Sequence, residues 1–188
     1  TNVDLAETER KTALEVNAKS LNYICKECKK NNTRLLHFST DYVFQGSANK
    51  PYLENDEIDP INYYGLTKLM GERIIYSKLN RYFIFRIAWL YSMNGNNFLK
   101  TVIKKLENGI SFKVVNDQFG TPTSTDFVSD VVVNFLSDNE IHAKSGIYHI
   151  SPNGVCTWYE FANAIKNEMK KKYNKLPVIL PTSSESYI

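Results

Sequence analysis

Tyr64 and Lys68, a tyrosine and a lysine four residues apart, are the residues of this sequence best suited to chemistry. At the start of a helix, this spacing places both side chains on one face. A cation beside a phenol favours the phenolate, so we expect the pKa of Tyr64 to lie below its ordinary value of about 10. Such a phenol could give or take a proton at a substrate oxygen near neutral pH.

A hydroxyl group precedes this pair along the chain. Thr40 ends a short apolar run, and doubly wound folds bind their ligands at the carboxyl ends of such strands. The Thr40 hydroxyl could hold a substrate carbonyl beside Tyr64, and the three side chains together suit hydride transfer involving a nicotinamide cofactor. Because Tyr-x-x-x-Lys is a weak motif by itself, an ordinary surface tyrosine and lysine remain the alternative.

The elements that must position these residues alternate between helices and strands. Apolar residues at steps of three and four predict helices over 5–30, 66–74, 98–106, 127–136 and 158–169. Apolar runs without that period predict strands at 34–40, 82–88, 112–115, 147–150 and 177–180. A capping box, Thr157 with Glu160 three residues on, marks the start of the last helix. The alternation predicts an α/β fold with a parallel sheet covered on both faces.

Composition excludes several classes of protein. The 188 residues carry a net charge of only +3, so we expect no nucleic acid among the partners of this protein. No apolar run reaches transmembrane length and no signal-peptide pattern occurs, so we expect no membrane partner and a cytoplasmic location. Cys25, Cys28 and Cys156 are expected to be reduced thiols. Since no second ligand pair follows Cys25-x-x-Cys28, we expect no metal site.

Five strings of residues occur in the order and at the spacing of one protein family. They run over 39–44 (STDYVF), 60–72 (PINYYGLTKLMGE), 86–91 (RIAWLY), 95–98 (GNNF) and 117–123 (DQFGTPT). Through these strings the chain resembles the dTDP-4-dehydrorhamnose reductases of the extended short-chain dehydrogenase/reductase family. The resemblance covers nearly the whole chain, from Thr1 to about Thr182.

The resemblance implies a fold and an activity. The fold is part of a Rossmann-type doubly wound parallel sheet, with catalytic residues in 1–92 and a smaller, interleaved substrate-binding α/β region in 93–188. The activity is reduction of the C4 ketone of dTDP-4-dehydro-L-rhamnose to dTDP-L-rhamnose with NADPH or NADH. None of the eight glycines forms the family's glycine-rich turn, so we expect the N-terminal cofactor-binding segment to be missing and this chain alone to be inactive.

The resemblance also implies roles for the three candidate residues. Thr40, Tyr64 and Lys68 match the family's catalytic triad. Tyr64 would protonate the C4 oxyanion, and Lys68 would lower the Tyr64 pKa and bind the nicotinamide ribose. The neighbouring Tyr63 is excluded, because the residue four positions on from it is Thr67 rather than a lysine.

Further positions match residues around the family's active site. Asp41 and Trp89, with Thr40, match contacts to the sugar. Thr1 and Phe38 match residues that line the cofactor, and Asn17 matches a helix asparagine that supports the active site. From the pattern alone, Trp89 could equally be core and Asn17 a surface amide.

Other functions remain open at this stage. The same fold can serve as a non-catalytic regulatory subunit, or as a reductase or epimerase for another nucleotide sugar. The complete set of Thr40, Tyr64 and Lys68, with Trp89, favours the enzyme, and Trp89 with the 117–123 string favours a nucleotide-sugar substrate of the rhamnose branch. The sequence also leaves a homodimer open.

Overall fold

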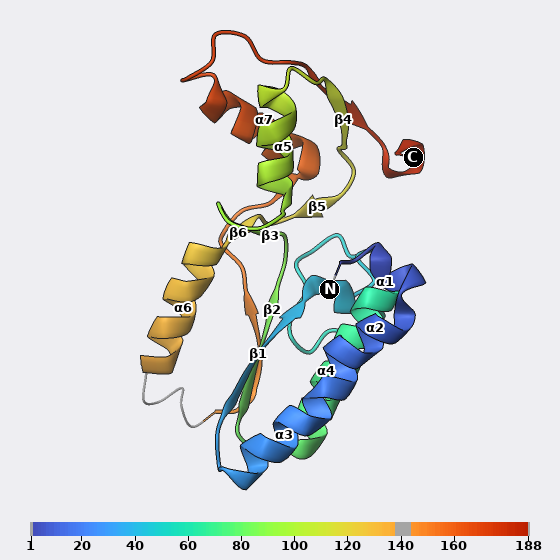
Figure 1. Cartoon of the computed structure of the whole chain (residues 1–188), viewed down its shortest axis with the longest axis vertical. Coiled ribbons are helices and arrows are strands. Elements are labelled where there is room, and N and C mark those ends of the chain that lie inside the picture. The colour runs from blue at the N-terminus through green and yellow to red at the C-terminus, as the bar shows by residue number, and fades with distance from the viewer. Residues whose placement is uncertain (1, 138–143, 188) are drawn as a thin grey trace. The chain divides into compact units, whose positions relative to one another are not determined.

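A computed structural model describes residues 2–137 and 144–187, and the chain separates into two compact units. Unit 1 comprises residues 1–87 and 134–150, and unit 2 comprises 88–133 and 151–188 (Figure 1). The chain thus leaves unit 1 after its second strand and returns to it for the third. A functional boundary at residue 92 stays a prediction.

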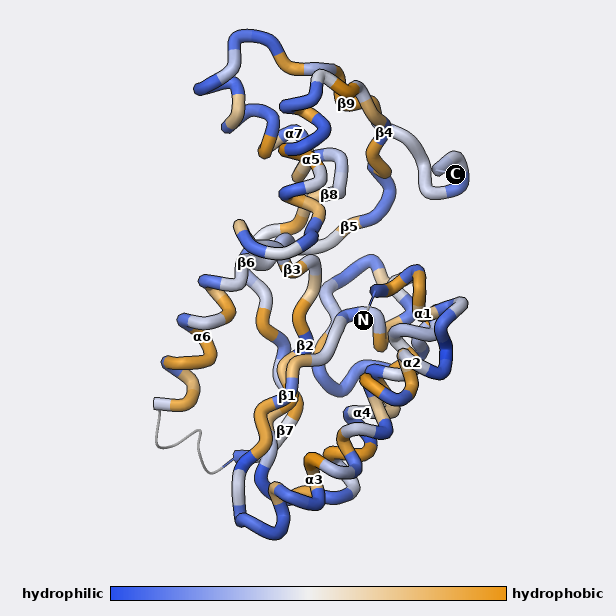
Figure 2. The backbone as a smooth tube through the Cα atoms, viewed as in Figure 1, coloured by the Kyte–Doolittle hydropathy of each residue, from blue (hydrophilic) through white to orange (hydrophobic). Residues whose placement is uncertain are grey.

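Unit 1 is built on a three-stranded parallel sheet. Its strands are β1 (Leu35–Thr40), β2 (Tyr82–Ile87) and β7 (Gly146–Ile150), in the order β1-β2-β7. The central strand β2 is buried along its whole length, as its apolar sequence predicts for a sheet covered on both faces (Figure 2). The predicted α/β class with a parallel sheet is therefore confirmed.

Two helices, α3 (Ser20–Lys30) and α4 (Tyr63–Lys78), lie side by side on one face of this sheet (Figure 1). The buried core beneath them consists of Leu21, Cys25, Ile75, Leu79, Tyr82 and Ile84. On the other face, Phe135 of α6 (Thr125–Ser137) packs edge-on against Phe83 and Phe85, with ring centroids 4.8 and 5.2 Å apart. Helices thus pack on both faces of this sheet.

The single helix predicted over 5–30 is wrong in detail. The structure has α1 (Leu5–Thr8), α2 (Arg10–Leu14) and a π-helical segment, η1 (Glu15–Lys19), before α3 begins. The chain turns at Glu9, where φ is −96° and ψ is 47°. Apolar steps of three and four cannot reveal one widened turn, and such π-turns often accompany functional sites.

A buried ion pair joins α4 to β2. The Arg86 guanidinium donates to both carboxylate oxygens of Glu72, at 3.0 and 2.7 Å, and also to the backbone carbonyl of Glu54 at 3.3 Å. The Glu54 carboxylate in turn accepts the backbone N–H of His149 at 2.9 Å. That N–H belongs to β7, which is an edge strand, so the loop before α4 partly covers this edge.

Unit 2 packs two helices against a small parallel ladder. The helices are α5 (Phe98–Glu107) and α7 (Trp158–Met169), and the ladder pairs β4 (Phe112–Val115) with β9 (Ile179–Thr182). Its buried core consists of Val102, Leu106, Val114, Ala162, Ile165 and Ile179. The predicted capping box is confirmed: Thr157 Oγ1 accepts the Glu160 N–H at 3.1 Å, and the Glu160 carboxylate accepts the Thr157 N–H at 2.7 Å.

Two short ladders complete unit 2. One pairs β3 (Leu90–Tyr91) with β6 (Thr123–Ser124) in parallel, and the other pairs β5 (Phe119–Gly120) with β8 (Cys156–Thr157) antiparallel. Within residues 2–137 and 144–187, no helix combines the length and apolarity needed to cross a membrane. All three cysteines are free thiols.

Candidate active site

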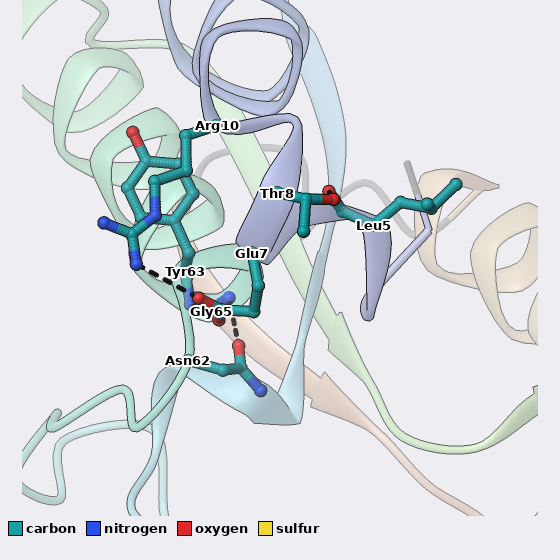
Figure 3. A network of polar contacts seen from close by, with 7 residues as sticks. All are labelled: Leu5, Glu7, Thr8, Arg10, Asn62, Tyr63 and Gly65. Carbon is teal, nitrogen blue, oxygen red and sulfur yellow. Dashed lines mark hydrogen bonds and ion pairs between the residues drawn. The ribbon is translucent and has the colours of Figure 1, made fainter.

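The N-terminus of α4, which carries Tyr64, is held by two side-chain caps. The Asn62 side chain accepts the Gly65 N–H at 2.7 Å, and the Glu7 carboxylate accepts the Tyr63 N–H at 2.7 Å (Figure 3). Both acceptors satisfy N–H groups that the first turn of a helix leaves unpaired. The Tyr63 N–H holds the pKa of Glu7 below its usual value, and Arg10, 3.3 Å away, adds to this effect.

The absence of a side chain at Gly65 lets the chain after β1 approach α4 closely. A Cβ atom at this position would lie 2.1 Å from the carbonyl oxygen of Tyr42. Tyr42 belongs to η2 (Asp41–Val43), the 3₁₀ turn that directly follows Thr40. The rings of Tyr42 and Tyr64 meet edge to face, with centroids 5.8 Å apart. This approach brings the end of β1 to the first turn of α4.

The structure brings Thr40 and Tyr64 together. The buried Thr40 hydroxyl donates to the Asp41 carboxylate at 3.0 Å and accepts the Tyr42 N–H at 3.2 Å. The Thr40 hydroxyl also acts on the nearby Tyr64 phenol, where it favours a lower pKa. A hydroxyl has one donor and two acceptor positions, and here the donor serves Asp41 while one acceptor serves the Tyr42 N–H. The structure therefore brings Thr40, Asp41 and Tyr64 together at the end of β1.

The pKa of Tyr64 lies above its ordinary value, so the expectation that Lys68 lowers it is wrong. Burial is the main cause of the rise; the Thr40 hydroxyl opposes it and the Asp41 carboxylate adds to it. The Lys68 ammonium instead donates to the Phe38 carbonyl at 2.6 Å. Tyr64 is consequently protonated at neutral pH, which is the form that a proton donor needs.

Lys68 lies in a half-buried position beside β1. Burial lowers the pKa of Lys68, although the Glu72 carboxylate partly opposes this. Its ammonium also lies 3.4 Å from Nε2 of His37, whose pKa is lowered to about 4 by burial and by Lys68. A neutral His37 can accept from Lys68 through Nε2. An ammonium has three N–H donors, so one is left for a ligand among the described contacts.

The two residues before Thr40 on β1, Phe38 and Ser39, differ in their surroundings. The Ser39 hydroxyl is buried and has no hydrogen-bond partner among the described residues. It lies on the same face of the strand as His37, because side chains alternate along a strand. Phe38, on the opposite face, is 45% exposed. Phe38 stays a predicted cofactor contact, and Thr1, another predicted cofactor residue, lies outside the described residues.

Asn17 reaches the first turn of α4 through a second hydroxyl. Its side-chain amide donates to Thr67 Oγ1 at 2.9 Å, and Thr67 Oγ1 donates to the Tyr64 carbonyl at 2.8 Å. The Asn17 carbonyl lies close to Gly71, where a Cβ atom would be 2.3 Å away. Asn17 is buried, so the alternative of a plain surface amide is wrong.

Trp89 lies in unit 2, directly after β2. It is half-buried, has a left-handed backbone with φ of 47°, and stacks on Trp158. Unit 2 also contains a pocket of about 460 Å³. Its lining mixes aromatic and hydroxyl side chains, among them Tyr91, Thr121, Ser124 and Phe127. Both the volume and the mixed lining are typical of small-molecule sites.

The sequence interpretation missed several residues that shape this site. Asn62 stands immediately before a helix, which is the usual position of an N-cap, so a local signal was present. Glu7 acts on Tyr63 from a distant segment, for which no local signal exists. The sequence gives no signal for Ser39, whose hydroxyl is buried and has no hydrogen-bond partner within the described parts of the chain.

A parallel sheet with a threonine at a strand end, facing a tyrosine and a lysine one helical turn apart, defines the class of extended short-chain dehydrogenases/reductases. Comparison with known proteins identifies the branch. The family model of the RmlD substrate binding domain matches residues 1–188, and the chain belongs to this family.

Several similar proteins carry the name dTDP-4-dehydrorhamnose reductase. The dTDP-4-dehydrorhamnose reductase of Escherichia coli K12 is 37% identical over 91% of this chain and 58% of its own length. The spore coat polysaccharide biosynthesis protein SpsK of Bacillus subtilis is 36% identical over 100% of this chain and 63% of its own length. A crystal structure of dTDP-4-dehydrorhamnose reductase from Bacillus anthracis in complex with NADP is 38% identical, with a TM-score of 0.89 over 100% of this chain and 64% of that one. This chain therefore spans about three-fifths of the length of these relatives.

Proposed function

We propose that the protein containing this chain reduces the C4 ketone of dTDP-4-dehydro-L-rhamnose to dTDP-L-rhamnose with NADPH. The observation that carries the proposal is that a protonated Tyr64 lies beside the hydrogen-bonded pair of Thr40 and Asp41, with Lys68 one turn further along α4. Named relatives at 37% and 38% identity support the substrate and reaction. The NADP complex of one relative favours NADPH over NADH.

The cofactor would lie beside β1, held by Lys68 and by the exposed ring of Phe38. When bound there, NADPH supplies a hydride for a carbonyl carbon. The remaining N–H of Lys68 would donate to a ribose hydroxyl of the cofactor. The hydrogen bond of Lys68 to the Phe38 carbonyl fixes the direction of the ammonium. Thr1 stays a predicted cofactor residue.

Tyr64 acts as the general acid. Its phenol gives a proton to the substrate oxygen as negative charge develops there, and a pKa raised by burial keeps that proton in place until the carbonyl is reduced. The Thr40 hydroxyl orients the same oxygen by a hydrogen bond, and without substrate it donates to Asp41. Asn17 holds the turn that carries Tyr64, because it acts through Thr67 on the Tyr64 carbonyl.

Asp41 and Trp89 are proposed to contact the sugar. The Asp41 carboxylate is an acceptor beside Thr40, and Trp89 offers an indole N–H from unit 2. We also propose a cytoplasmic location, because the reducing cytoplasm keeps cysteines as free thiols, the state of all three here. A homodimer stays a prediction.

The proposal is tested with the full-length gene product. NADPH oxidation is followed by absorbance after addition of dTDP-4-dehydro-L-rhamnose, and the product is identified by mass spectrometry and NMR. We expect stoichiometric formation of dTDP-L-rhamnose. The corresponding UDP-linked 4-keto sugar is the control for nucleotide selectivity. A folded protein that oxidises NADPH with neither sugar contradicts the proposal and favours a regulatory subunit, and preference for the UDP sugar would indicate another nucleotide-sugar reductase.

A further inference from the structure

The two tryptophans of this chain, Trp89 and Trp158, lie against each other within unit 2. Their ring centroids are 3.6 Å apart and their planes differ by 11°, so the indoles are stacked face to face. Trp89 follows β2 and Trp158 begins α7, so the contact joins distant parts of the sequence. Any tryptophan signal of the chain therefore reports on this pair.

Trp158 is fixed by its own surroundings. It is the first residue of α7, directly after the capping box of Thr157. The preceding strand β8 is paired with β5, and the ring of Phe98 lies 4.5 Å from that of Trp158. A helix start, a strand pairing and an aromatic contact thus hold one ring of the stack in place.

Gly120 bounds the Trp89 indole on its other side. A Cβ atom at Gly120 would lie 2.3 Å from Cε2 of Trp89 and 2.6 and 2.7 Å from the neighbouring Cζ2 and Nε1. The distance is shortest to the middle atom of the three, which places this Cβ over the plane of the ring rather than beyond its edge. Since Trp158 covers one face, Gly120 lies against the other.

The backbone of Trp89 is restrained as well. Its φ of 47° is a rare conformation for a bulky residue, and such residues persist where their surroundings determine them. The Trp89 carbonyl accepts the Thr123 N–H at 3.2 Å, at the start of the β3–β6 ladder. The indole N–H has no hydrogen-bond partner among the described residues and is not fully buried.

We infer that Trp158 and Gly120 are positioning residues that clamp the Trp89 indole between them and direct its N–H edge to the sugar of the substrate. The inference rests on the proposed function, because it takes Trp89 as a sugar contact. It deepens that function by assigning the contact to the indole N–H. A sugar stacked on the ring is excluded, since both faces are covered.

The clamp itself is tested by circular dichroism. Two indoles at van der Waals separation couple their electronic transitions and produce a far-ultraviolet couplet, so the parent protein should show one. Gly120→Ala substitutes neither tryptophan, but its methyl group would clash with the Trp89 ring and displace it. The couplet should therefore disappear. Gly146→Ala is the matched control, because its Cβ would find its nearest neighbour at an ordinary 3.4 Å and the couplet should remain.

The functional consequence is tested by kinetics of the full-length protein. Gly120→Ala and Trp158→Leu should raise KM for the nucleotide sugar about 3- to 10-fold, the effect expected for one misplaced hydrogen bond. KM for NADPH should be unchanged. Trp158→Phe keeps an aromatic ring beneath Trp89 and should restore KM for the sugar, which a general loss of stability would not do.

Each result decides a separate point. Loss of the couplet in Gly120→Ala without a change in KM for the sugar overturns the inference, as does a couplet that survives this substitution. If Gly120→Ala does not fold, Trp158→Leu and Trp158→Phe decide, and equal KM values in both oppose it. If the parent reduces neither 4-keto sugar, the proposed function has failed, and the couplet alone decides whether Gly120 restrains Trp89.

Discussion

Replacing Glu72 by glutamine tests the packing that holds α4 against the sheet. The Glu72 and Arg86 side chains are only 3% and 2% exposed, and their ion pair joins the helix of Tyr64 and Lys68 to strand β2. Glutamine keeps the shape of glutamate and one acceptor oxygen. It removes the charge that balances the buried guanidinium.

The expected loss follows from what Arg86 retains. Removing one partner of a buried ion pair typically costs about 3–5 kcal/mol, because the other charge stays buried without compensation. Arg86 keeps the Glu54 carbonyl at 3.3 Å and the face of the Phe44 ring at 5.0 Å. With one glutamine oxygen still available, we expect the lower end, a loss of about 3 kcal/mol in the free energy of unfolding.

Urea denaturation measures this loss. For a slope of about 2 kcal/mol per molar, the midpoint should fall by about 1.5 M. Far-ultraviolet circular dichroism follows both units, whereas tryptophan fluorescence follows unit 2 alone, since Trp89 and Trp158 both lie there. The larger shift should therefore appear in the dichroism if the units unfold separately.

The matched control is Glu168→Gln, which removes an ion pair of the same type on the surface. Glu168 and its partner Lys171 are each 73% exposed. Exposed pairs contribute little, so we expect a change below about 0.5 kcal/mol. Equal stability of the Glu72→Gln and Glu168→Gln proteins would refute the view that the Glu72–Arg86 pair holds α4 in place.

Two further substitutions probe the support of the site. Gly71→Ala should lower the free energy of unfolding by about 1–3 kcal/mol in urea, since its Cβ would lie 2.3 Å from the Asn17 carbonyl, while Gly146→Ala should change it little. His37 has a pKa of about 4 in the folded protein against an ordinary 6.5, so the unfolded chain takes up its proton first as the pH falls. The contribution of His37 to the free energy of unfolding should be fully present above pH 6.5 and should be lost as the pH falls from there to 4. His37→Asn should flatten this decline when unfolding is measured across pH. Lys68→Met should raise the His37 pKa in an NMR titration without reaching 6.5, because burial is the larger cause; an unchanged value would contradict the observed contact.

The longer elements were predictable because their signals are local. The strands of the main sheet are continuous apolar runs, and α4 and α7 begin at side-chain caps visible in the sequence. The ladders β3–β6 and β5–β8 were missed because each strand has only two residues and no period. They exist through pairing with distant residues, such as Gly120 with Cys156.

The candidate site was predictable in its composition but not in its electrostatics. A strand end and a helix start place Thr40 and Tyr64, so their meeting follows from the topology. The pKa of Tyr64 depends instead on burial and on where Lys68 finds an acceptor, which is the Phe38 carbonyl. No spacing rule contains that information. The contact of Glu7 with the Tyr63 N–H was equally hidden.

The neighbouring tyrosines Tyr63 and Tyr64 differ clearly in the structure. The Tyr63 ring lies under the guanidinium of Arg10, 4.9 Å from its centroid, whereas the Tyr64 ring packs edge to face against Tyr42, close to Thr40. Tyr64→Phe removes only the phenolic oxygen, and Tyr63→Phe makes the same change one residue away. The two variants therefore form a matched pair.

The most direct measurement of the central claim is kcat for NADPH-dependent reduction of dTDP-4-dehydro-L-rhamnose by these two variants of the full-length protein. We expect Tyr64→Phe to lower kcat by roughly 10²–10⁴-fold, the range of general acid catalysis, with NADPH binding nearly unchanged. Tyr63→Phe should keep close to the parent turnover. A Tyr64→Phe protein as active as the parent, or an inactive Tyr63→Phe protein that is still folded, would contradict the assignment of Tyr64 as the proton donor.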